Sequence, residues 1–322
     1  MSKPNAFRLV VGMPCRNEGL AVLTALAAIG RAVQRFTFEV PVAVCLNAES
    51  SSADASLLRE VSERGLAGHI LHEERPGKCF ALNRIMQTLE ADIYIFVDAD
   101  VIVEPQSLVA LYEALLLEPQ GVPAKGGELW IANRDEGLVC LATQYLGKDV
   151  FQEHRTVLYG GFFAIRRCLV PSFPPVLSID LYLSTLLRMR SPATSARCPE
   201  AKAAYRHPST YGDYVRKAIR SNYKVRQLHR VLPPSRAVPY EDFQLARRGL
   251  RTPSFAGLRI CLTLLFLEAT AAAVGGCWRL VVLMRLCAEP VAWNPSDCLT
   301  TKFYPETAES LKQDLTLRRP SP

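Results

Sequence analysis

The sequence predicts an α/β fold in which helices flank a mostly parallel sheet, followed by a C-terminal helical tail. Two observations support this prediction. Apolar runs of strand length alternate with helix-like stretches through the first two-thirds of the 322 residues, and prolines then precede a long apolar segment. Strand–helix repetition of this kind implies right-handed crossovers between parallel strands. The composition, 49% hydrophobic and 21% charged, is that of a globular protein able to bury a core.

The elements follow in a regular order. The predicted strands are 8–13, 39–47, 69–72, 92–98, 122–131, 157–166 and 201–206, and the predicted helices are 19–34, 54–64, 77–89, 179–190 and 210–230. The strand at 92–98 (DIYIFVD) is strongly apolar, which suits the middle of a sheet. We expect one domain over residues 1–235 and a helical, apolar extension over residues 236–322, with Pro233, Pro234 and Pro239 marking the boundary.

The segment 255–288 is apolar on nearly every face. Its longest uncharged runs, 260–267 and 269–278, are shorter than the roughly 20 residues that a membrane-spanning helix needs. Two interpretations remain open: a buried helical hairpin, or an interfacial helix that makes peripheral contact with a membrane.

The ten cysteines are scattered without metal-binding spacing, and the first eight residues are polar. Both features predict a reducing, cytoplasmic location, including the inner face of the membrane if segment 255–288 docks there. The net charge of +7 is concentrated between residues 206 and 259, where twelve Lys/Arg accompany three acidic residues. A localised basic region suits phosphate groups.

Polar side chains follow several predicted strands at the point where each strand ends. Asp98-Ala99-Asp100 lies at the end of this apolar strand, and paired carboxylates there suit a divalent cation shared with substrate phosphates. The alternative is an acidic turn. Ligands bind beyond the carboxyl ends of parallel strands, so the loops after Met13, Asn47, His72 and Asp98 are expected to share one edge.

The other three loops carry further candidate groups. The stretch from Pro14 to Glu18 is irregular and polar, and Glu49 lies in the loop after the second strand. Arg75-Pro76-Gly77-Lys78 opens a helix, whose exposed N–H groups and lysine predict an anion site.

The segments VVGMPCRNE, RPGKCFALN, FVDAD and GGFFAIRR, followed by Ile179-Asp180, occur in that order along residues 8–230. Together they resemble the signature set of the family 2 glycosyltransferases, which have the GT-A fold, a Rossmann-type sheet. The resemblance implies a metal-dependent, inverting transfer of a sugar from a nucleotide diphosphate donor to an acceptor hydroxyl. We expect a UDP-sugar as the donor and Mg²⁺ or Mn²⁺ as the cofactor.

The resemblance also implies site residues. The catalytic base would be Asp180, and the metal ligand Asp100. The nucleotide-sugar-binding residues would be Pro14, Cys15, Asn17, Glu18, Glu49, Lys78, Asp98, Ala99, Gly160 and Gly161. His207 is a candidate additional metal ligand, against the alternative of a structural histidine.

The sequence departs from the family pattern in informative places. Ile179 precedes Asp180 where the family often has glutamate, and Lys217–Ser221 replaces the Gln-x-x-Arg-Trp motif of processive synthases. We therefore expect transfer of a single sugar. Arg216 and Arg220 would reach a donor or acceptor phosphate or form a solvated helix face. A lipid carrier, a glycan end and a small metabolite all suit the acceptor role, and the basic, apolar last third favours a lipid-linked one.

Three other classes compete with this interpretation. A sugar-phosphate nucleotidyltransferase would need a glycine-rich loop after the first strand, which the chain lacks. A catalytically degenerate nucleotide-binding or scaffold protein would tend to lose the metal site, yet Asp98, Asp100 and Asp180 are present. Nucleic-acid binding by residues 206–259 lacks a recognisable motif, so no nucleic-acid partner is expected.

Overall fold

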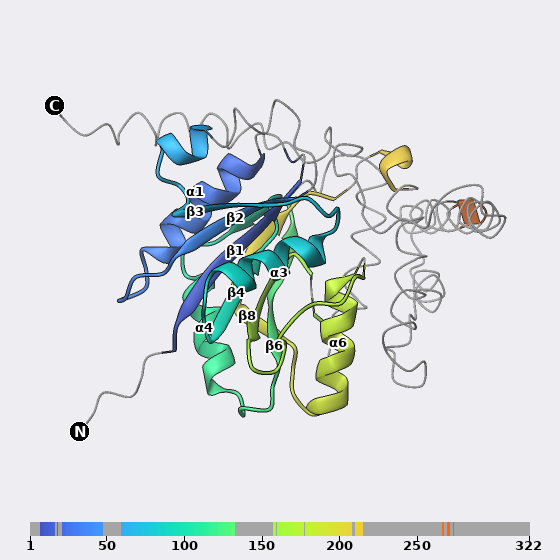
Figure 1. The fold of residues 1–322 in the computed structure, drawn as a ribbon. Coiled ribbons are helices and arrows are strands. Elements are labelled where there is room, and N and C mark those ends of the chain that lie inside the picture. The colour runs from blue at the N-terminus through green and yellow to red at the C-terminus, as the bar shows by residue number, and fades with distance from the viewer. Residues whose placement is uncertain are drawn as a thin grey trace, which may run out of the picture.

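The computed structural model describes residues 7–16, 18, 21–47, 59–132, 157–158, 160–176, 178–207, 210–214, 266, 269–270 and 273. Within these ranges one eight-stranded sheet runs in the order β3-β2-β1-β4-β7-β6-β8-β5 (Figure 1). The strands are β1 (Leu9–Cys15), β2 (Val42–Asn47), β3 (His69–Glu73), β4 (Ile93–Val97), β5 (Val101–Val103), β6 (Ala124–Ile131), β7 (Phe162–Arg166) and β8 (Arg197–Tyr205). The helices are α1 (Ala21–Val33), α3 (Lys78–Thr88), α4 (Ser107–Leu117) and α6 (Ile179–Arg190).

The sheet is mixed but mostly parallel. β1 pairs in parallel with β2 and β4, β2 with β3, and β6 with β8, whereas β7 is antiparallel to β4 and β6, and β5 is antiparallel to β8. The predicted fold class is therefore confirmed. The mixture has a structural consequence: β7 runs against its neighbours, so its first residue lies beside the last residue of β4.

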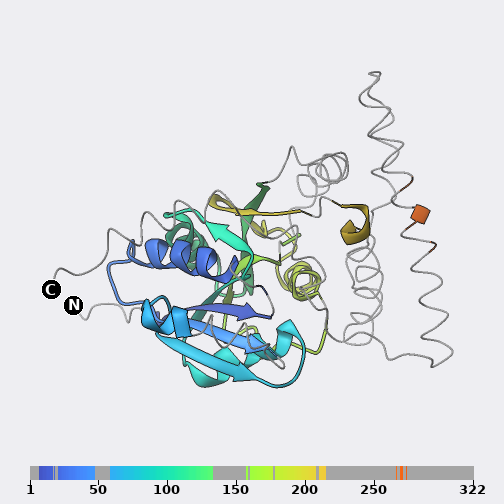
Figure 2. The ribbon, with the colours of Figure 1, turned by 90° about the horizontal axis from the view of Figure 1, so that it is seen from above.

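The core fills both faces of the central strands. Every residue of β1, β2, β4 and β7 is buried, as expected for strands covered on both sides. α1 packs beside α4 on one face of the sheet, and α3 covers β1, β2 and β3 on the other (Figure 2). Aromatic rings of Tyr94, Phe96 and Phe163 form the centre.

Several predicted boundaries need correction. β1 continues through Pro14 and Cys15, which pair with Cys45 and Leu46 of β2, so these two residues belong to a buried strand and not to an irregular loop. β7 begins at Phe162, after the two glycines that the predicted strand had included, and β5 and α4 were not predicted at all. The helix α6 has the predicted bounds. Most of segment 255–288 and most of the predicted helix at 210–230 lie outside the described residues, so the proposed two-domain division stays a prediction.

Candidate active site

The sheet topology brings the carboxyl ends of β1, β2 and β4 and the amino end of β7 to one edge, here called the site edge. Val97, the last residue of β4, pairs with Phe162, the first of β7. Asp98 consequently lies beside Gly161, and its backbone N–H donates to the Gly161 carbonyl over 2.8 Å. Two residues that are 63 positions apart in the sequence are thus joined by a main-chain hydrogen bond.

Lys78, the first residue of α3, contacts both sides of this meeting point. Its Nζ lies 2.5 Å from Asp98 Oδ1 and donates to the Gly160 carbonyl over 2.6 Å. The same ammonium lies 5.7 Å from the centre of the Phe163 ring. Both charged side chains are about three-quarters buried, with exposed fractions of 25% for Lys78 and 29% for Asp98. Three predicted site residues therefore form one partly buried, charged cluster.

The glycine pair lies directly against the predicted base. A Cβ atom added to Gly160 would be 2.8 Å from the Asp180 Cβ and 2.9 Å from its Cγ, closer than real carbon atoms approach. A Cβ on Gly161 would be 3.1 Å from Val101 Cγ2 and 3.8 Å from Asp98 Oδ2. The absence of side chains at these positions allows the Asp180 carboxyl group to approach the main chain that Lys78 holds.

Asp180 is the second residue of α6, and two serines fix it. The Ser178 hydroxyl, at the N-cap position, donates to Asp180 Oδ1, and the Ser184 hydroxyl donates to the Asp180 carbonyl over 2.6 Å. Ser184 also accepts the Leu158 N–H over 2.9 Å, which ties α6 to the segment before the glycines. Sequence analysis missed Ser178, although serine just before a helix is a usual capping signal.

Asn47 is a second residue that sequence analysis did not assign. It is the last residue of β2, and its buried amide donates to the Arg75 carbonyl over 2.7 Å and accepts the Gly77 N–H over 2.6 Å. Gly77 has a φ of 141°, a conformation that favours glycine. Asn47 thus fixes the turn from which α3 starts, and so the position of Lys78. This contact joins residues 28 and 30 positions apart and has no local sequence signal.

The candidate metal ligands lie at the same edge. Val101, at the start of β5, pairs with Tyr205, the last residue of β8. Because these two strands are antiparallel, Asp100, just before β5, and His207, just after β8, both lie at the same end of the strand pair. His207 is buried, and its ring centre lies 6.0 Å from that of Tyr205. Among the described residues no group of three or more His, Cys, Asp or Glu side chains is arranged to hold a metal ion.

The remaining predicted residues are placed as follows. Pro14 and Cys15 are buried in β1, Glu18 is buried beyond it, and Ala99 is buried between the two aspartates. Asn17, Glu49, Arg216 and Arg220 lie outside the described residues. Burial raises the pKa of the Cys45 thiol to about 12 and also raises the pKa of Cys79, which disfavours the thiolate form of both residues at neutral pH.

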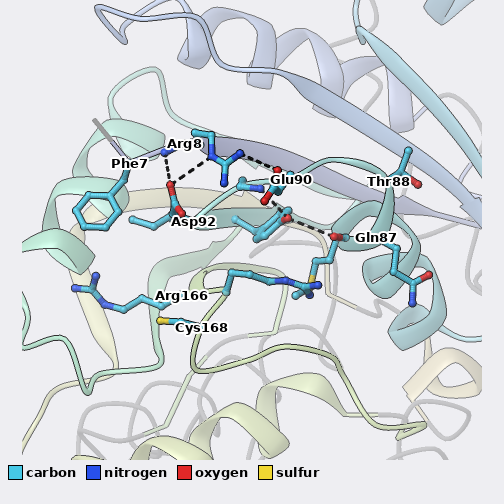
Figure 3. A pocket seen from close by; sticks show the side chains of 13 residues that line it. Phe7, Arg8, Gln87, Thr88, Glu90, Asp92, Arg166 and Cys168 are labelled. Carbon is cyan, nitrogen blue, oxygen red and sulfur yellow. Dashed lines mark hydrogen bonds and ion pairs between the residues drawn. The ribbon is translucent and has the colours of Figure 1, made fainter. Parts of the chain in front are cut away.

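A cavity of about 600 Å³ lies at the opposite edge of the sheet and contains none of the predicted site residues (Figure 3). Its charged groups contact one another or the main chain. Arg8 pairs with Glu90 over 2.9 Å and donates its backbone N–H to Asp92 over 2.8 Å, while Arg166 binds the carbonyls of Leu115 and Glu118.

In the part of the chain that the structure describes, no helix has both the length and the apolar character needed to cross a bilayer.

No protein-family model and no curated protein sequence matches the chain. Solved structures do. The mannosyltransferase PcManGT from Pyrobaculum calidifontis, in complex with GDP-Man and Mn²⁺, superimposes with a TM-score of 0.52 and 17% identity over 99% of this chain and 92% of that one. Glucosyl-3-phosphoglycerate synthase from Mycobacterium tuberculosis, in complex with Mn²⁺, UDP and phosphoglyceric acid, gives 0.51 and 19% identity over 73% and 81%. The chain has the GT-A fold. At these identities the similarity establishes the fold alone.

Proposed function

We propose that the protein is a metal-dependent, inverting glycosyltransferase that moves one sugar from a nucleotide diphosphate donor, a UDP-sugar, to an acceptor hydroxyl. The proposal depends on one observation above all. Lys78, Asp98, Gly160 and Asp180 come from four separate segments and converge at one sheet edge, through contacts of 2.5 Å and 2.6 Å and a glycine approach that excludes any Cβ. An ordinary acidic turn would not bring a lysine, two glycines and a helix-borne carboxylate together.

The donor diphosphate would bind at the start of α3. Lys78 supplies an ammonium there, the backbone N–H groups of the first helical turn have no side-chain cap, and the helix dipole favours negative charge at this end. Lys78 would exchange part of its contact with Asp98 for a phosphate oxygen. Asp98 would then be available to accept a hydrogen bond from a ribose hydroxyl.

The residues present fit a hard divalent cation that also binds the diphosphate. A carboxylate from Asp100 and the imidazole of His207 would hold it, and a site that shares its ion with phosphate oxygens needs few protein ligands. When bound, the ion would neutralise charge on the leaving diphosphate. The solved neighbours named above contain Mn²⁺, which supports a divalent metal in this fold.

Asp180 would remove the proton of the acceptor hydroxyl. The acceptor oxygen then forms a bond to the anomeric carbon as the bond from that carbon to the diphosphate oxygen breaks, and the electron pair leaves with the diphosphate. Attack opposite the leaving group inverts the anomeric centre. Ser178 orients the carboxylate by donating to Oδ1, which suits a base that must meet its substrate in one geometry. The basic and apolar last third of the sequence supports a lipid-linked acceptor.

Calorimetric titration with UDP, GDP and dTDP, each with and without MnCl₂, tests the proposal. We expect micromolar binding of UDP that requires Mn²⁺. Metal-dependent binding of GDP or dTDP alone would keep the transferase and change the donor. If the folded protein binds none of the three nucleotides, the proposal is wrong and a non-catalytic protein of the same fold takes its place.

A further inference from the structure

Asn83 belongs to the RPGKCFALN segment, but none of the roles above uses it. It lies in the middle of α3, five residues after Lys78. Its side-chain amide donates to the Phe173 carbonyl over 2.8 Å and accepts the Phe173 N–H over 2.7 Å. Both polar ends of one side chain therefore bind the backbone of a single residue that is 90 positions away.

Phe173 is also fixed through its ring. The ring is 3% exposed and packs edge-on against Phe96 and Phe163, with centre-to-centre distances of 6.0 Å and 6.4 Å. Phe96 and Phe163 belong to β4 and β7, the strands that meet at Asp98 and Gly161. Hydrogen bonds and aromatic packing thus hold Phe173 at one place behind the site edge.

The position of Phe173 constrains the start of α6. Only the residues from 174 to 179 separate it from Asp180, and Ser178 in that stretch donates to the Asp180 carboxylate. Residues before Phe173 are held as well, because Arg167 donates to the Pro171 carbonyl. A shift of Phe173 would therefore be passed on to the base through a short, restrained segment that contains Pro174 and Pro175.

The same helix carries Lys78. Five residues of α-helix span about 7.5 Å, so Lys78 and Asn83 are parts of one rigid rod. We propose that Asn83 is a positioning residue for Asp180: through Phe173 it ties the base to α3, so that the helix that meets the donor phosphates also sets where the base stands relative to Gly160. This inference rests on the proposed function of the site. If the inference is right, a change at Asn83 affects catalysis, whereas a change at a residue that only stabilises the fold affects thermal stability.

The test is Asn83→Asp, which keeps the oxygen that accepts the Phe173 N–H and replaces the donor with an oxygen that faces the Phe173 carbonyl. Gln87→Glu is the matched control, because it makes the same amide-to-carboxylate change at an exposed position of α3. Ile29→Val, in the buried face of α1, supplies a loss of thermal stability without touching either segment. Asn83→Ala removes both hydrogen bonds and serves as a second variant.

Four quantities are measured on the full chain. They are the affinity for UDP with MnCl₂, the rate of nucleotide release from UDP-glucose, GDP-mannose and dTDP-glucose, hydrogen exchange over residues 171–180, and the melting temperature. For Asn83→Asp we expect release to slow at least tenfold, UDP affinity to stay within about twofold of wild type, and exchange over 171–180 to rise. Gln87→Glu should change none of these quantities, and Ile29→Val should lower only the melting temperature.

Two results would overturn the inference. One is Asn83→Asp with wild-type turnover. The other is a loss of turnover and affinity together, in proportion to the melting temperature, which would make Asn83 a structural residue only. Wild-type protein that neither binds nor turns over any of these nucleotides would instead refute the proposed function, and this failure is seen before any variant is made.

Discussion

The two ends of β4 offer a direct comparison, because an aspartate flanks each of them. Asp92 precedes the strand and accepts the backbone N–H of Arg8 over 2.8 Å at an exposed edge. Asp98 follows the strand, is partly buried and contacts the Lys78 ammonium over 2.5 Å. An acidic residue at a strand end is thus insufficient to make a site, and the neighbours of each aspartate decide its role.

Those neighbours differ in size and in polarity. At the edge of Asp92, long side chains fill the space: Arg166 binds the last carbonyls of α4 and Lys125 pairs with Glu118 over 2.6 Å, so C-terminal helix ends are satisfied there. At the edge of Asp98, two glycines leave room and the amino ends of α3 and α6 begin. Positive helix ends next to open main chain favour an anionic substrate at the site edge only.

The largest expected difference between the two edges is catalytic. Asp180→Asn keeps an oxygen for the Ser178 hydroxyl but removes the proton acceptor. We expect turnover to fall by about 10²–10⁴ while UDP affinity with Mn²⁺ stays within about twofold. Asp92→Asn makes the same change at the opposite edge and should leave turnover intact. Near-normal nucleotide-sugar turnover by Asp180→Asn would remove this residue from the base role.

The next difference concerns the metal. Asp100→Ala removes a carboxylate at the site edge, and we expect Mn²⁺-dependent UDP affinity to fall roughly tenfold to hundredfold, since even indirect partners of metal sites have effects of that size. Glu90→Ala removes an exposed carboxylate at the other edge and should have no effect on affinity. Calorimetry with and without MnCl₂ measures both variants. Unchanged metal-dependent affinity in Asp100→Ala would rule out the metal assignment.

A single methyl group gives a sharper comparison. Gly160→Ala would place Cβ within 2.8 Å of the Asp180 Cβ, so the base must move, and we expect turnover to fall about tenfold to hundredfold. Gly121→Ala, at the opposite edge, meets no atom within 4 Å and should behave as wild type. Steady-state kinetics should assign the loss to kcat, with little change in the KM for the donor. A Gly160→Ala enzyme with normal kcat would show that the glycine approach is not needed for catalysis.

The predictable parts of the molecule are those with a local signal. The apolar runs of β2 and β4 and the periodicity of Ile179–Arg190 gave elements close to those observed, and the strand-end rule placed Lys78 and Asp98 on one edge. Gly160 lay inside a predicted strand, and only the family resemblance pointed to it. β5 has only three residues and is defined by its pairing with β8, which no local pattern encodes. The amides of Asn47 and Asn83 bind backbone groups 28 to 90 positions away. Every residue has a backbone carbonyl, so the type of the partner residue gives no sign of such a hydrogen bond.

The smallest expected effect compares two thiols. Cys79 lies in the first turn of α3 at the site edge, where a helix amino end would normally lower the pKa of a thiol, yet the structure buries it and its pKa is raised. Cys168 lies at the opposite edge and is exposed. We expect a thiol reagent at pH 8 to modify Cys168 within minutes, with Cys79 and Cys45 still unmodified. Burial raises the pKa of Cys45 to about 12, so this thiol stays protonated at pH 8. Peptide mapping by mass spectrometry separates these positions, and Cys168→Ser provides the control.

Rapid modification of Cys79 that UDP with Mn²⁺ prevents would mean that this turn is open to solvent and that the thiol lies within the donor site. Lys78 would then hold a less enclosed position than its contacts with Asp98 and Gly160 indicate.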